Sequence, residues 1–445
     1  MTDSVKKPEA AIGARLSVMM FLEFFVWGGW YVTVGNFLKA QGMDAAIPWA
    51  YSVCPIAAII SPFFLGIIAD RFFSTQKVLG VMCLLSGITL TMLPSVAPMR
   101  ETYNLWILGD RTVFDIVLLL HAICFMPTLG LTNTVAFSHV TDQKKQFPLI
   151  RVFGTIGWIV ANLVVSSLLQ GDTKAVQFYV AAGAAVLLGV YSFMLPHTPP
   201  PAAGKTSSVG DILGVQSLKL MRNGSFAVFV VSSFLICIPL AFYYSYAPVF
   251  VGGTGVKEVA SLMSLGQMSE IFFMLVMPLC FARLGLKWML LVGMAAWVVR
   301  YGLFAFAASH APLADGAVLH AIAQYGVWGA IVGDGVHPLV LMGILLHGIC
   351  YDFFFVTGQI YVDGIAPPRI RGQVQGFLVL VTQGVGMLIG AQVAGKLVAF
   401  YTVAERIQWL NVWGIPCIAA GVIMLVFAAT FRSGNEQKPA EELAA

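Results

Sequence analysis

The feature that most constrains this chain is a series of apolar runs, each long enough to cross a membrane. A membrane-spanning helix needs about 20 apolar residues, and the sequence contains twelve such runs. Charged residues make up only 10% of the 445 residues, whereas about 25% is usual in soluble domains. So few charges exclude a cytosolic enzyme, a secreted disulfide-rich protein and a nucleic-acid-binding protein. The chain is predicted to be an all-α polytopic membrane protein with twelve transmembrane helices.

The one clear linker, residues 196–222, contains four prolines and divides the runs into six and six. The spans are expected at 14–39, 46–69, 77–97, 113–140, 147–170, 174–195, 223–251, 257–282, 286–309, 337–363, 371–400 and 407–432. The predicted parts are a tail (1–13), a six-helix bundle (14–195), a linker (196–222), a second six-helix bundle (223–432) and a second tail (433–445). A short, glycine-broken apolar stretch, Val318–Val332, is expected to be an insert outside the cytoplasm rather than a span.

The distribution of basic residues predicts the orientation of the chain. Seventeen of the 25 Lys and Arg residues fall on the side that also holds both termini, and seven fall on the other side. Because basic residues are retained on the cytoplasmic side, both termini are expected in the cytoplasm. The first apolar run, Leu16–Leu38, contains Glu23 and lacks a small-residue cleavage sequence, so it predicts a retained helix rather than a signal peptide.

Polar residues inside the spans are the candidate functional residues, because burying them in a membrane is costly. In the fifth span, Arg151, Thr155 and Trp158 recur at helical spacing on one face. A cation, a hydroxyl and an indole in one stripe suit a water-filled cavity that binds a flat, polar molecule. The alternative is an arginine retained by the positive-inside rule, followed by hydrogen bonds between helices.

Two further polar groups lie in the second half of the chain. Gln267 and Glu270 are three residues apart in the eighth span and therefore share a face. In the tenth span His347 and Tyr351 share a face, and Asp352 lies beside it. All five are expected to line a cavity, with helix-to-helix hydrogen bonding as the alternative. A carboxyl group can take up a proton on one side of a membrane and release it on the other, so Glu270 and Asp352 are the expected proton carriers.

The role of Glu23 is left open by its surroundings in the sequence. It shares a face of the first span with Trp27 and Trp30, and it could be a third proton carrier or a buried structural carboxyl group. Arg300 in the ninth span is expected to be structural, as a partner of one of these acids.

Aromatic and sulfur-containing residues add less to the prediction. An aromatic cluster at 242–246 is expected to be mostly packing, with Tyr244 as the ring that reaches the cavity. The seven cysteines lie in apolar runs without a CxxC pair, so neither a disulfide framework nor a metal site is indicated.

The layout of twelve spans in two sets of six is that of the major facilitator superfamily. The sequence Gly66-Ile-Ile-Ala-Asp70-Arg71, followed by Lys77, resembles the loop motif of that superfamily between spans two and three. The positive-inside rule would explain Arg71 and Lys77, but it would not explain Asp70.

Four ordered motifs between about residues 16 and 430 resemble the bacterial nucleoside:proton symporter family of this superfamily. They are Phe125-Met-Pro-Thr-Leu-Gly-Leu-Thr-Asn-Thr134, Phe147-Pro-Leu-Ile-Arg-Val-Phe-Gly-Thr-Ile-Gly-Trp158, Gly266-Gln-Met-Ser-Glu270 and Tyr351-Asp-Phe-Phe354. The segments Ile238–Tyr244 and Leu345–Gly348 resemble a less characterised branch of the same family.

The resemblance implies roles for the matching positions. Arg151, Thr155 and Trp158 would face the ligand, with Trp158 in place of a Phe, and Gln267 and Glu270 match the family unchanged. Tyr351 and Asp352 match a Phe-Asp pair whose acid is important for transport. In the same pocket, Ala241 and Tyr244 replace an amide pair, and His347 replaces a tyrosine.

These observations predict a secondary transporter that imports nucleosides together with protons across the bacterial inner membrane by alternating access. It would act as a monomer in the lipid bilayer, with a small-molecule substrate, no cofactor and no nucleic-acid partner, and it would not be an enzyme. The alternatives are a proton symporter for another polar molecule such as a sugar or a modified nucleoside, a passive facilitator, and a membrane receptor without transport activity.

Overall fold

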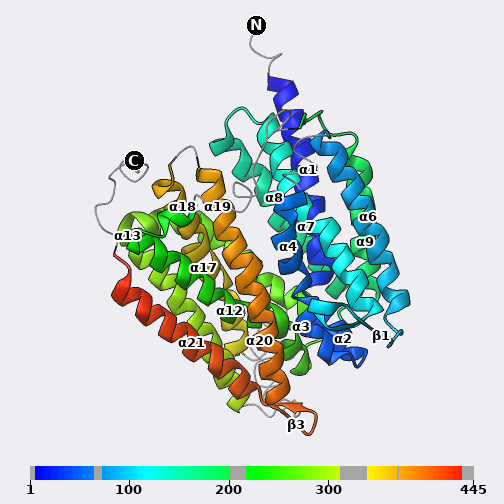
Figure 1. Ribbon diagram of the computed structural model, residues 1–445, viewed down its shortest axis with the longest axis vertical. Helices are drawn as coiled ribbons and strands as arrows, with labels where there is room; N and C mark the ends of the chain where they lie inside the picture. The colour runs from blue at the N-terminus through cyan, green and yellow to red at the C-terminus, as the bar shows by residue number, and fades with distance from the viewer. Residues whose placement is uncertain (1–5, 65–72, 201–216, 311–337, 368–369, 433–445) are drawn as a thin grey trace, which may run out of the picture. The chain divides into compact units, whose positions relative to one another are not determined.

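The computed structural model describes residues 6–64, 73–200, 217–310, 338–367 and 370–432. The whole of the motif segment Gly66–Arg71, and the whole of the stretch Val318–Val332, lie outside the described residues. The chain divides into two compact units, Met1–Ser208 and Val209–Ala445, and the division falls within the segment 196–222. Figure 1 shows both units as bundles of long helices.

The first unit contains six apolar spans built from eight helices, a 3₁₀ turn and a π-helical turn. Their bounds in chain order are α1 Lys6–Tyr31, α2 Val34–Ala40, η1 Asp44–Ala46, α3 Ile47–Ala50, α4 Val53–Phe64, α6 Thr75–Val96, α7 Val113–His139, α8 Gln143–Leu163, η4 Val164–Leu168 and α9 Val176–Ser192. Helix α1 packs against α7, α8 and α9. One core of this unit gathers apolar side chains of α1, α6, α7 and α9, including Leu16, Met20, Leu79 and Leu131.

The second unit contains the other six spans. Its helices are α11 Ser217–Leu220, α12 Gly224–Gly253, α13 Val259–His310, α16 Pro338–Leu345, α17 His347–Tyr351, η5 Asp352–Val356, α18 Thr357–Ile365, α19 Arg371–Val379, η6 Leu380–Gly386, α20 Met387–Phe400 and α21 Trp409–Thr430. Helix α13 is long enough for two spans, and its two halves meet at Gly285, whose φ of 69° lies in the left-handed region that favours glycine. Ten helical stretches of the described residues are long and apolar enough to cross a membrane. Counting α13 twice and adding the shorter apolar helix α9 gives twelve spans, which confirms the predicted fold class.

Two of the described helices, α7 and α12, begin with a short polar side chain that caps the first turn. Thr112 begins α7 with a capping box, in which its hydroxyl accepts from the Asp115 N–H and the Asp115 carboxylate accepts from the Thr112 N–H. The Asn223 side chain accepts from the Phe226 N–H at 3.0 Å at the start of α12. These caps supply partners for N–H groups that the first turn of a helix leaves free.

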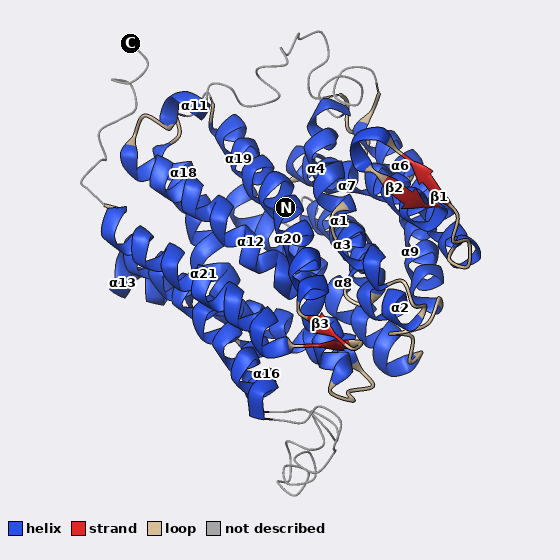
Figure 2. Cartoon of the chain, turned by 60° about the horizontal axis from the view of Figure 1, so that its bottom comes forward, coloured by secondary structure: helices blue, strands red, loops and turns tan. Residues whose placement is uncertain are grey.

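Two small hairpins, which the hydropathy pattern does not predict, connect pairs of spans (Figure 2). Strands β1 (Thr102–Asn104) and β2 (Asp110–Thr112) pair antiparallel, with Tyr103 opposite Arg111, around the 3₁₀ turn η3 (Trp106–Leu108). Strands β3 (Thr402–Val403) and β4 (Arg406–Ile407) form the second antiparallel pair. Both are too short to carry an alternating apolar pattern.

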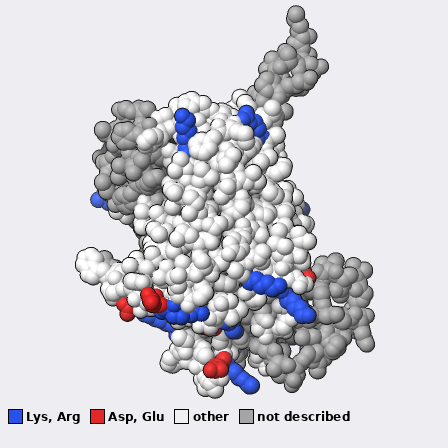
Figure 3. All heavy atoms as spheres, turned by 90° about the vertical axis from the view of Figure 1, so that its right-hand side faces the viewer, with Lys and Arg blue, Asp and Glu red and all other residues white. Residues whose placement is uncertain are grey.

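Charged side chains are unevenly distributed over the surface. Figure 3 shows one face of the molecule, on which Lys and Arg lie near one end, Lys, Arg, Asp and Glu gather toward the other, and the band between them is largely uncharged. Exposed apolar residues such as Leu187, Leu275 and Ile418 are 57%, 77% and 69% exposed in the structure. An apolar surface of this kind is stable when it faces lipid, so the chain is a multi-pass membrane protein.

Candidate functional site

The polar stripe of the fifth span lies on α8 in the first unit. The Arg151 guanidinium carbon lies 4.0 Å from the centre of the Phe24 ring of α1, a cation–π contact. Trp158 meets Trp27 edge to face at 5.6 Å and Tyr31 at 6.1 Å between ring centres. Arg151, Thr155 and Trp158 are all half-buried, so each keeps part of its side chain accessible.

Helix α1 approaches this stripe closely because small residues face it. A Cβ atom on Gly28 would lie 3.0 Å from the backbone of Trp158, and a Cβ atom on Gly157 would overlap the Phe21 carbonyl. Glycines therefore permit near-contact between the backbones of α1 and α8, as is common between membrane helices. This contact fixes the positions of Arg151 and Trp158 relative to the rings of α1.

Glu23 lies on the same helix but points toward α7. It is 0% exposed, and its Oε1 atom lies 2.6 Å from the hydroxyl of Thr128. Trp30, predicted on the same face, packs edge to face on His121 at 5.3 Å, and His121 is hydrogen-bonded to the Ser86 hydroxyl at 3.1 Å. Glu23 and Trp30 thus belong to the interior of the first unit.

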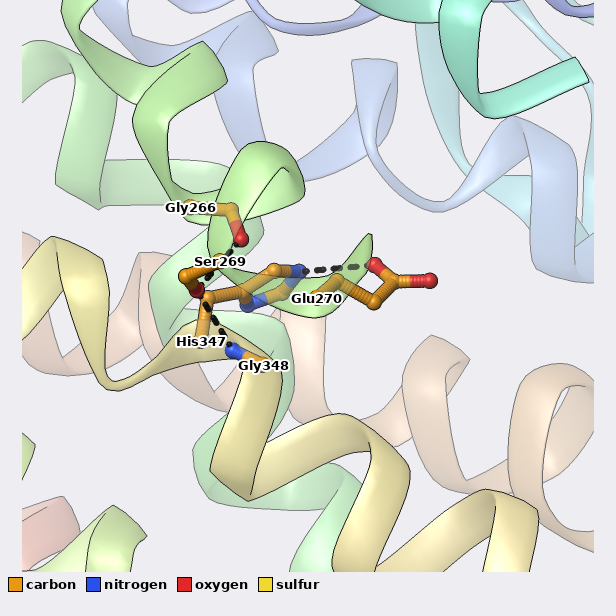
Figure 4. A network of polar contacts seen from close by, with 5 residues as sticks. All are labelled: Gly266, Ser269, Glu270, His347 and Gly348. Carbon is orange, nitrogen blue, oxygen red and sulfur yellow. Dashed lines mark hydrogen bonds and ion pairs between the residues drawn. The ribbon is translucent and has the colours of Figure 1, made fainter. Parts of the chain in front are cut away.

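The second unit brings Glu270 and His347 together. His347 Nε2 lies 3.9 Å from Glu270 Oε2, and the side chain of Glu270 is 16% exposed while that of His347 is 3% exposed. Figure 4 shows the two side chains pointing toward one another from α13 and α17. An imidazole and a carboxylate at this distance attract each other when the imidazole is protonated.

Backbone contacts around Ser269 hold this pair in place. The Ser269 hydroxyl donates to the Gly266 carbonyl at 2.7 Å and accepts from the Gly348 N–H at 3.0 Å (Figure 4). A Cβ atom on Gly348 would lie 2.6 Å from the Ser269 carbonyl carbon, so only glycine allows α17 to come this close to α13. Ser269, which precedes Glu270, and Gly348, which follows His347, are therefore held in direct contact.

Aromatic rings surround the imidazole of His347. Tyr243 stacks on it at 5.3 Å, Tyr244 meets it edge to face at 6.3 Å, and Tyr351 lies at 6.0 Å between ring centres. Tyr244 and Tyr351 are half-buried, whereas Tyr243 is 1% exposed. Three predicted residues from two spans, Tyr244 of the seventh and His347 and Tyr351 of the tenth, are thus close neighbours.

Arg300 contacts this aromatic group instead of an acid. Its guanidinium carbon lies 3.8 Å above the Tyr243 ring, and its Nε donates to the Gly343 carbonyl at 2.9 Å. Within the described residues, its two terminal nitrogens have no hydrogen-bond partner. The expected pairing of Arg300 with an acid is replaced by a cation–π contact and a carbonyl.

Asp352 begins the π-helical segment η5, next to Tyr351 at the end of α17. It is 0% exposed, and neither carboxyl oxygen has a hydrogen-bond partner among the residues that the structure describes. π-Helical turns inside α-helices are frequent at functional sites. Gln267, one turn before Glu270 on α13, is half-buried, and its side-chain oxygen likewise lacks a hydrogen-bond partner there.

Several residues that contact the candidate site residues cannot be recognised from the sequence motifs. Thr128 and Ser269 lie inside motifs that we quote for the family resemblance, but nothing in their spacing indicates a partner. Tyr243 is one of several adjacent aromatics, and the ring predicted to reach a cavity is its neighbour Tyr244. Phe24 carries no polar group at all, so a cation–π contact to it is visible only in three dimensions.

The chemistry of these residues suits binding and proton exchange. Carboxyl groups, an imidazole, amides and aromatic rings can hold a flat polar molecule and take up protons. In the described ranges, no group of three or more His, Cys, Asp or Glu side chains is arranged to hold a metal ion.

Comparison with known proteins extends this description. The model of the family described as nucleoside H+ symporter matches residues 10–436. The chain is 37% identical over 437 residues to an Escherichia coli protein named "Putative nucleoside transporter YegT", covering 95% of both chains. It is 30% identical over 444 residues to the nucleoside permease NupG of Escherichia coli, covering 96% of this chain and 97% of the other.

Solved structures agree with the family match. A crystal structure of a substituted form of the nucleoside transporter NupG aligns with a TM-score of 0.80 and 28% identity, covering 95% of this chain and 100% of that chain. Motifs, fold and family match extend over nearly the same residues. The chain belongs to the nucleoside H+ symporter family.

Proposed function

We propose that this protein imports nucleosides together with protons by alternating access across the bacterial inner membrane, with both termini in the cytoplasm. Membership of the nucleoside H+ symporter family along nearly the whole chain supports this proposal most strongly. The excess of basic residues on one side of the predicted spans supports the orientation. The protein would not be an enzyme, would need no cofactor, and would work as a monomer without a nucleic-acid partner.

Each unit, taken by itself, holds polar and aromatic side chains suited to binding a substrate. The proposed substrate-binding residues are Arg151, Thr155, Trp158, Tyr244, Gln267, Glu270, His347 and Tyr351. The half-buried rings of Trp158, Tyr244 and Tyr351 support this assignment, because they can stack on a planar base. The Gln267 amide can both donate to and accept from the edge of a base. The domain bounds 14–195 and 223–432 for the two six-helix bundles are part of the same proposal.

Proton coupling would use the two acids of the second unit, Glu270 and Asp352. The contact between Glu270 and His347 at 3.9 Å supports this role most directly. An acid beside an imidazole can exchange a partner when it gains or loses a proton, so its charge state can be linked to substrate binding. The buried position of Asp352, without a hydrogen-bond partner in the described part of the chain, gives it a reason to be neutral in one state.

A second candidate function is proton symport of a different polar molecule, such as a sugar or modified nucleoside. One specific observation favours it. Ala241, at one of the positions where the family resemblance implies an amide, is fully buried, and a Cβ atom on Gly390 would lie 2.6 Å from its Cβ atom. Helix α12 therefore packs tightly on α20 at this point, and no amide is available there to hold a base or a sugar.

The test is uptake by purified protein in liposomes under an imposed proton gradient, acidic outside. Labelled purine and pyrimidine nucleosides, free bases and sugars are compared, with protein-free liposomes and a protonophore as controls. We expect a nucleoside to accumulate above its external concentration and the protonophore to abolish accumulation. Accumulation of a sugar alone would select the second candidate, whereas equilibration unaffected by the gradient would identify a passive facilitator.

Thermal stabilisation of the protein by the same compounds at two pH values tests binding separately. A ligand that binds only the folded state raises the melting temperature. Stabilisation by nucleosides is expected, and its absence alongside stabilisation by a sugar would again favour the second candidate.

A further inference from the structure

The Thr128 hydroxyl lies within hydrogen-bond distance of two oxygen atoms but carries only one proton. The Thr128 hydroxyl oxygen lies 2.6 Å from Glu23 Oε1 and 2.5 Å from the Phe125 carbonyl oxygen. The first is an ordinary O–H···O hydrogen-bond distance, and the second lies at the short limit of that range. A hydroxyl carries one proton, and an ionised carboxylate and a carbonyl can only accept. One of the two hydrogen bonds therefore needs a proton that Thr128 does not have.

Other threonines on α7 indicate where the Thr128 proton goes. The Thr132 hydroxyl donates to the Leu129 carbonyl at 3.1 Å, and the Thr134 hydroxyl donates to the Gly130 carbonyl at 3.0 Å. In each case the proton is given to a carbonyl of the same helix, three or four residues earlier, which is a common arrangement for threonine in membrane helices. If Thr128 donates to Phe125 in the same way, the proton between Thr128 and Glu23 belongs to Glu23.

The surroundings of Glu23 also favour a neutral acid. The side chain is 0% exposed, and among the described residues its second oxygen, Oε2, has no hydrogen-bond partner. The adjacent core contains Met20, Leu22 and Leu131. An ionised carboxylate with one oxygen unsatisfied in such a place would lose its hydration without compensation, whereas a neutral acid loses far less.

Among the residues that the structure describes, no basic group pairs with Glu23 to offset that cost. The titratable and charged side chains on the helices around this part of α1 are Cys54 on α4, Cys83 on α6, His121 and Cys124 on α7, and Arg151 on α8. His121 is hydrogen-bonded to Ser86, and the Arg151 guanidinium lies over the ring of Phe24.

We propose that Glu23 keeps its proton throughout transport and donates it to the Thr128 hydroxyl, so that it is a positioning residue of the first unit and not a proton carrier. The donated hydrogen bond ties α1 to α7. One turn later on α1, Trp27 meets Phe125 at 6.1 Å and Trp158 at 5.6 Å. The tie therefore sets the depth at which Trp27 packs between α7 and α8, next to the proposed substrate-binding residue Trp158.

The proposal has two parts, and only the statement about proton carrying rests on the proposed function. Glu23→Gln is the decisive variant, because the glutamine amide can donate to Thr128 but cannot release a proton. Glu23→Ala removes the donor, and Glu270→Gln is the matched control, because it neutralises an acid that we propose as a carrier.

Infrared spectroscopy tests the protonation state independently of transport. The difference spectrum between wild type and Glu23→Gln, in detergent or lipid at neutral pH, is expected to contain the carbonyl stretching band of a protonated carboxylic acid. The band is expected to stay constant over the whole pH range in which uptake is measured. A carboxylate band in its place, or a band that titrates within that range, would overturn the proposal.

Uptake and melting temperature test the positioning role. Glu23→Gln is expected to keep the melting temperature, the gradient-driven uptake and its pH profile, whereas Glu23→Ala lowers the melting temperature and slows uptake. Loss of accumulation in Glu23→Gln with nucleoside binding retained would make Glu23 a carrier and overturn the proposal. If wild-type protein accumulated no nucleoside, the proposed function would fail, but the infrared and melting results would still decide the state of Glu23.

Discussion

The first and second units both bury carboxyl groups among apolar helices, but they hold them differently. In the first unit Glu23 is 0% exposed and lies 2.6 Å from the Thr128 hydroxyl, and both residues are buried inside the same helix bundle. In the second unit Glu270 is 16% exposed beside an imidazole, and Asp352 is buried at the start of a π-helical segment. Solvent access and a titratable neighbour allow Glu270 to change its charge. Asp352 is as enclosed as Glu23, but no hydrogen-bond partner among the described residues holds its carboxyl group in one state, whereas Glu23 has a hydroxyl partner and is suited to stay as it is. The comparison teaches that a buried acid in a transporter span is not by itself a proton carrier.

The largest expected effect comes from removing an acid of the second unit. Glu270→Gln and Asp352→Asn should each abolish gradient-driven nucleoside accumulation, because an amide cannot take up and release the coupled proton. Uptake into liposomes with and without the gradient is the measurement. Asp363→Asn is the matched control, because Asp363 lies in the same span as Asp352 but is 54% exposed and pairs with Arg371. Full accumulation in both variants would remove the difference that we draw between the units.

A smaller but still large effect is expected when the backbone contact beneath the acid–imidazole pair is disturbed. Gly348→Leu should destabilise the protein by about 3 kcal/mol, because any Cβ atom at this position would collide with the Ser269 carbonyl. The fraction of protein that remains folded after heating in detergent reports the effect. Gly364→Ala, in the same span with no atom within 4 Å of an added Cβ, should be neutral or slightly stabilising. Equal stability of the two variants would contradict the close approach of α13 and α17.

Arg151 tests whether the first unit contributes to ligand binding even though we propose that its acid carries no coupled proton. Arg151→Ala should weaken nucleoside binding about tenfold, or about 1.4 kcal/mol, and leave the melting temperature of the ligand-free protein close to wild type. Ligand-dependent thermal shifts measure both quantities. Arg100→Ala serves as the control, because Arg100 is exposed and donates only to the Gln41 carbonyl at 2.8 Å. An unchanged affinity in Arg151→Ala would make Arg151 a structural residue.

The smallest effect concerns two threonines of α7 that differ in one contact. Thr128→Val should lower the free energy of unfolding by about 1 kcal/mol, because it leaves the Glu23 carboxyl group without its hydroxyl partner. Thr132→Val should change it much less, since Thr132 is equally buried but donates only to a carbonyl of its own helix. If the two variants lost equal stability, the contact between Glu23 and Thr128 would add nothing to the first unit.

The helices could be predicted closely because the membrane leaves few alternatives. Backbone groups in lipid must be satisfied within the segment, so a long apolar run can only be a helix. The run expected at 371–400, for example, is helical from Arg371 to Phe400 through α19, η6 and α20. The hairpin at 102–112 could not be predicted in this way, because three-residue strands carry no detectable period, and their pairing depends on the turn between them.

The candidate residues could be predicted by type and by span, but their partners could not. Glu270 and His347 are 77 positions apart, and only the packing of α17 on α13 brings them within 3.9 Å. Helical spacing is also misleading where a π-helical turn intervenes. In a regular α-helix Gln359 would lie two turns after Asp352 on the same face. The π-helical segment η5 has more residues per turn, so this spacing no longer holds. Gln359 is exposed, whereas Asp352 is fully buried.

The contact of Gly348 with the backbone of Ser269 and Glu270 has a mechanical consequence for the second unit. Where two helices touch through their main chains, no flexible side chains lie between them that would let one helix slide along the other. A displacement of α17 along its axis would drive the Gly348 Cα against the Ser269 carbonyl and break the hydrogen bond from the Gly348 N–H. A movement of span eight or span ten at this point therefore moves the other, so that the main chains at Glu270 and His347 travel together while their side chains remain able to exchange partners.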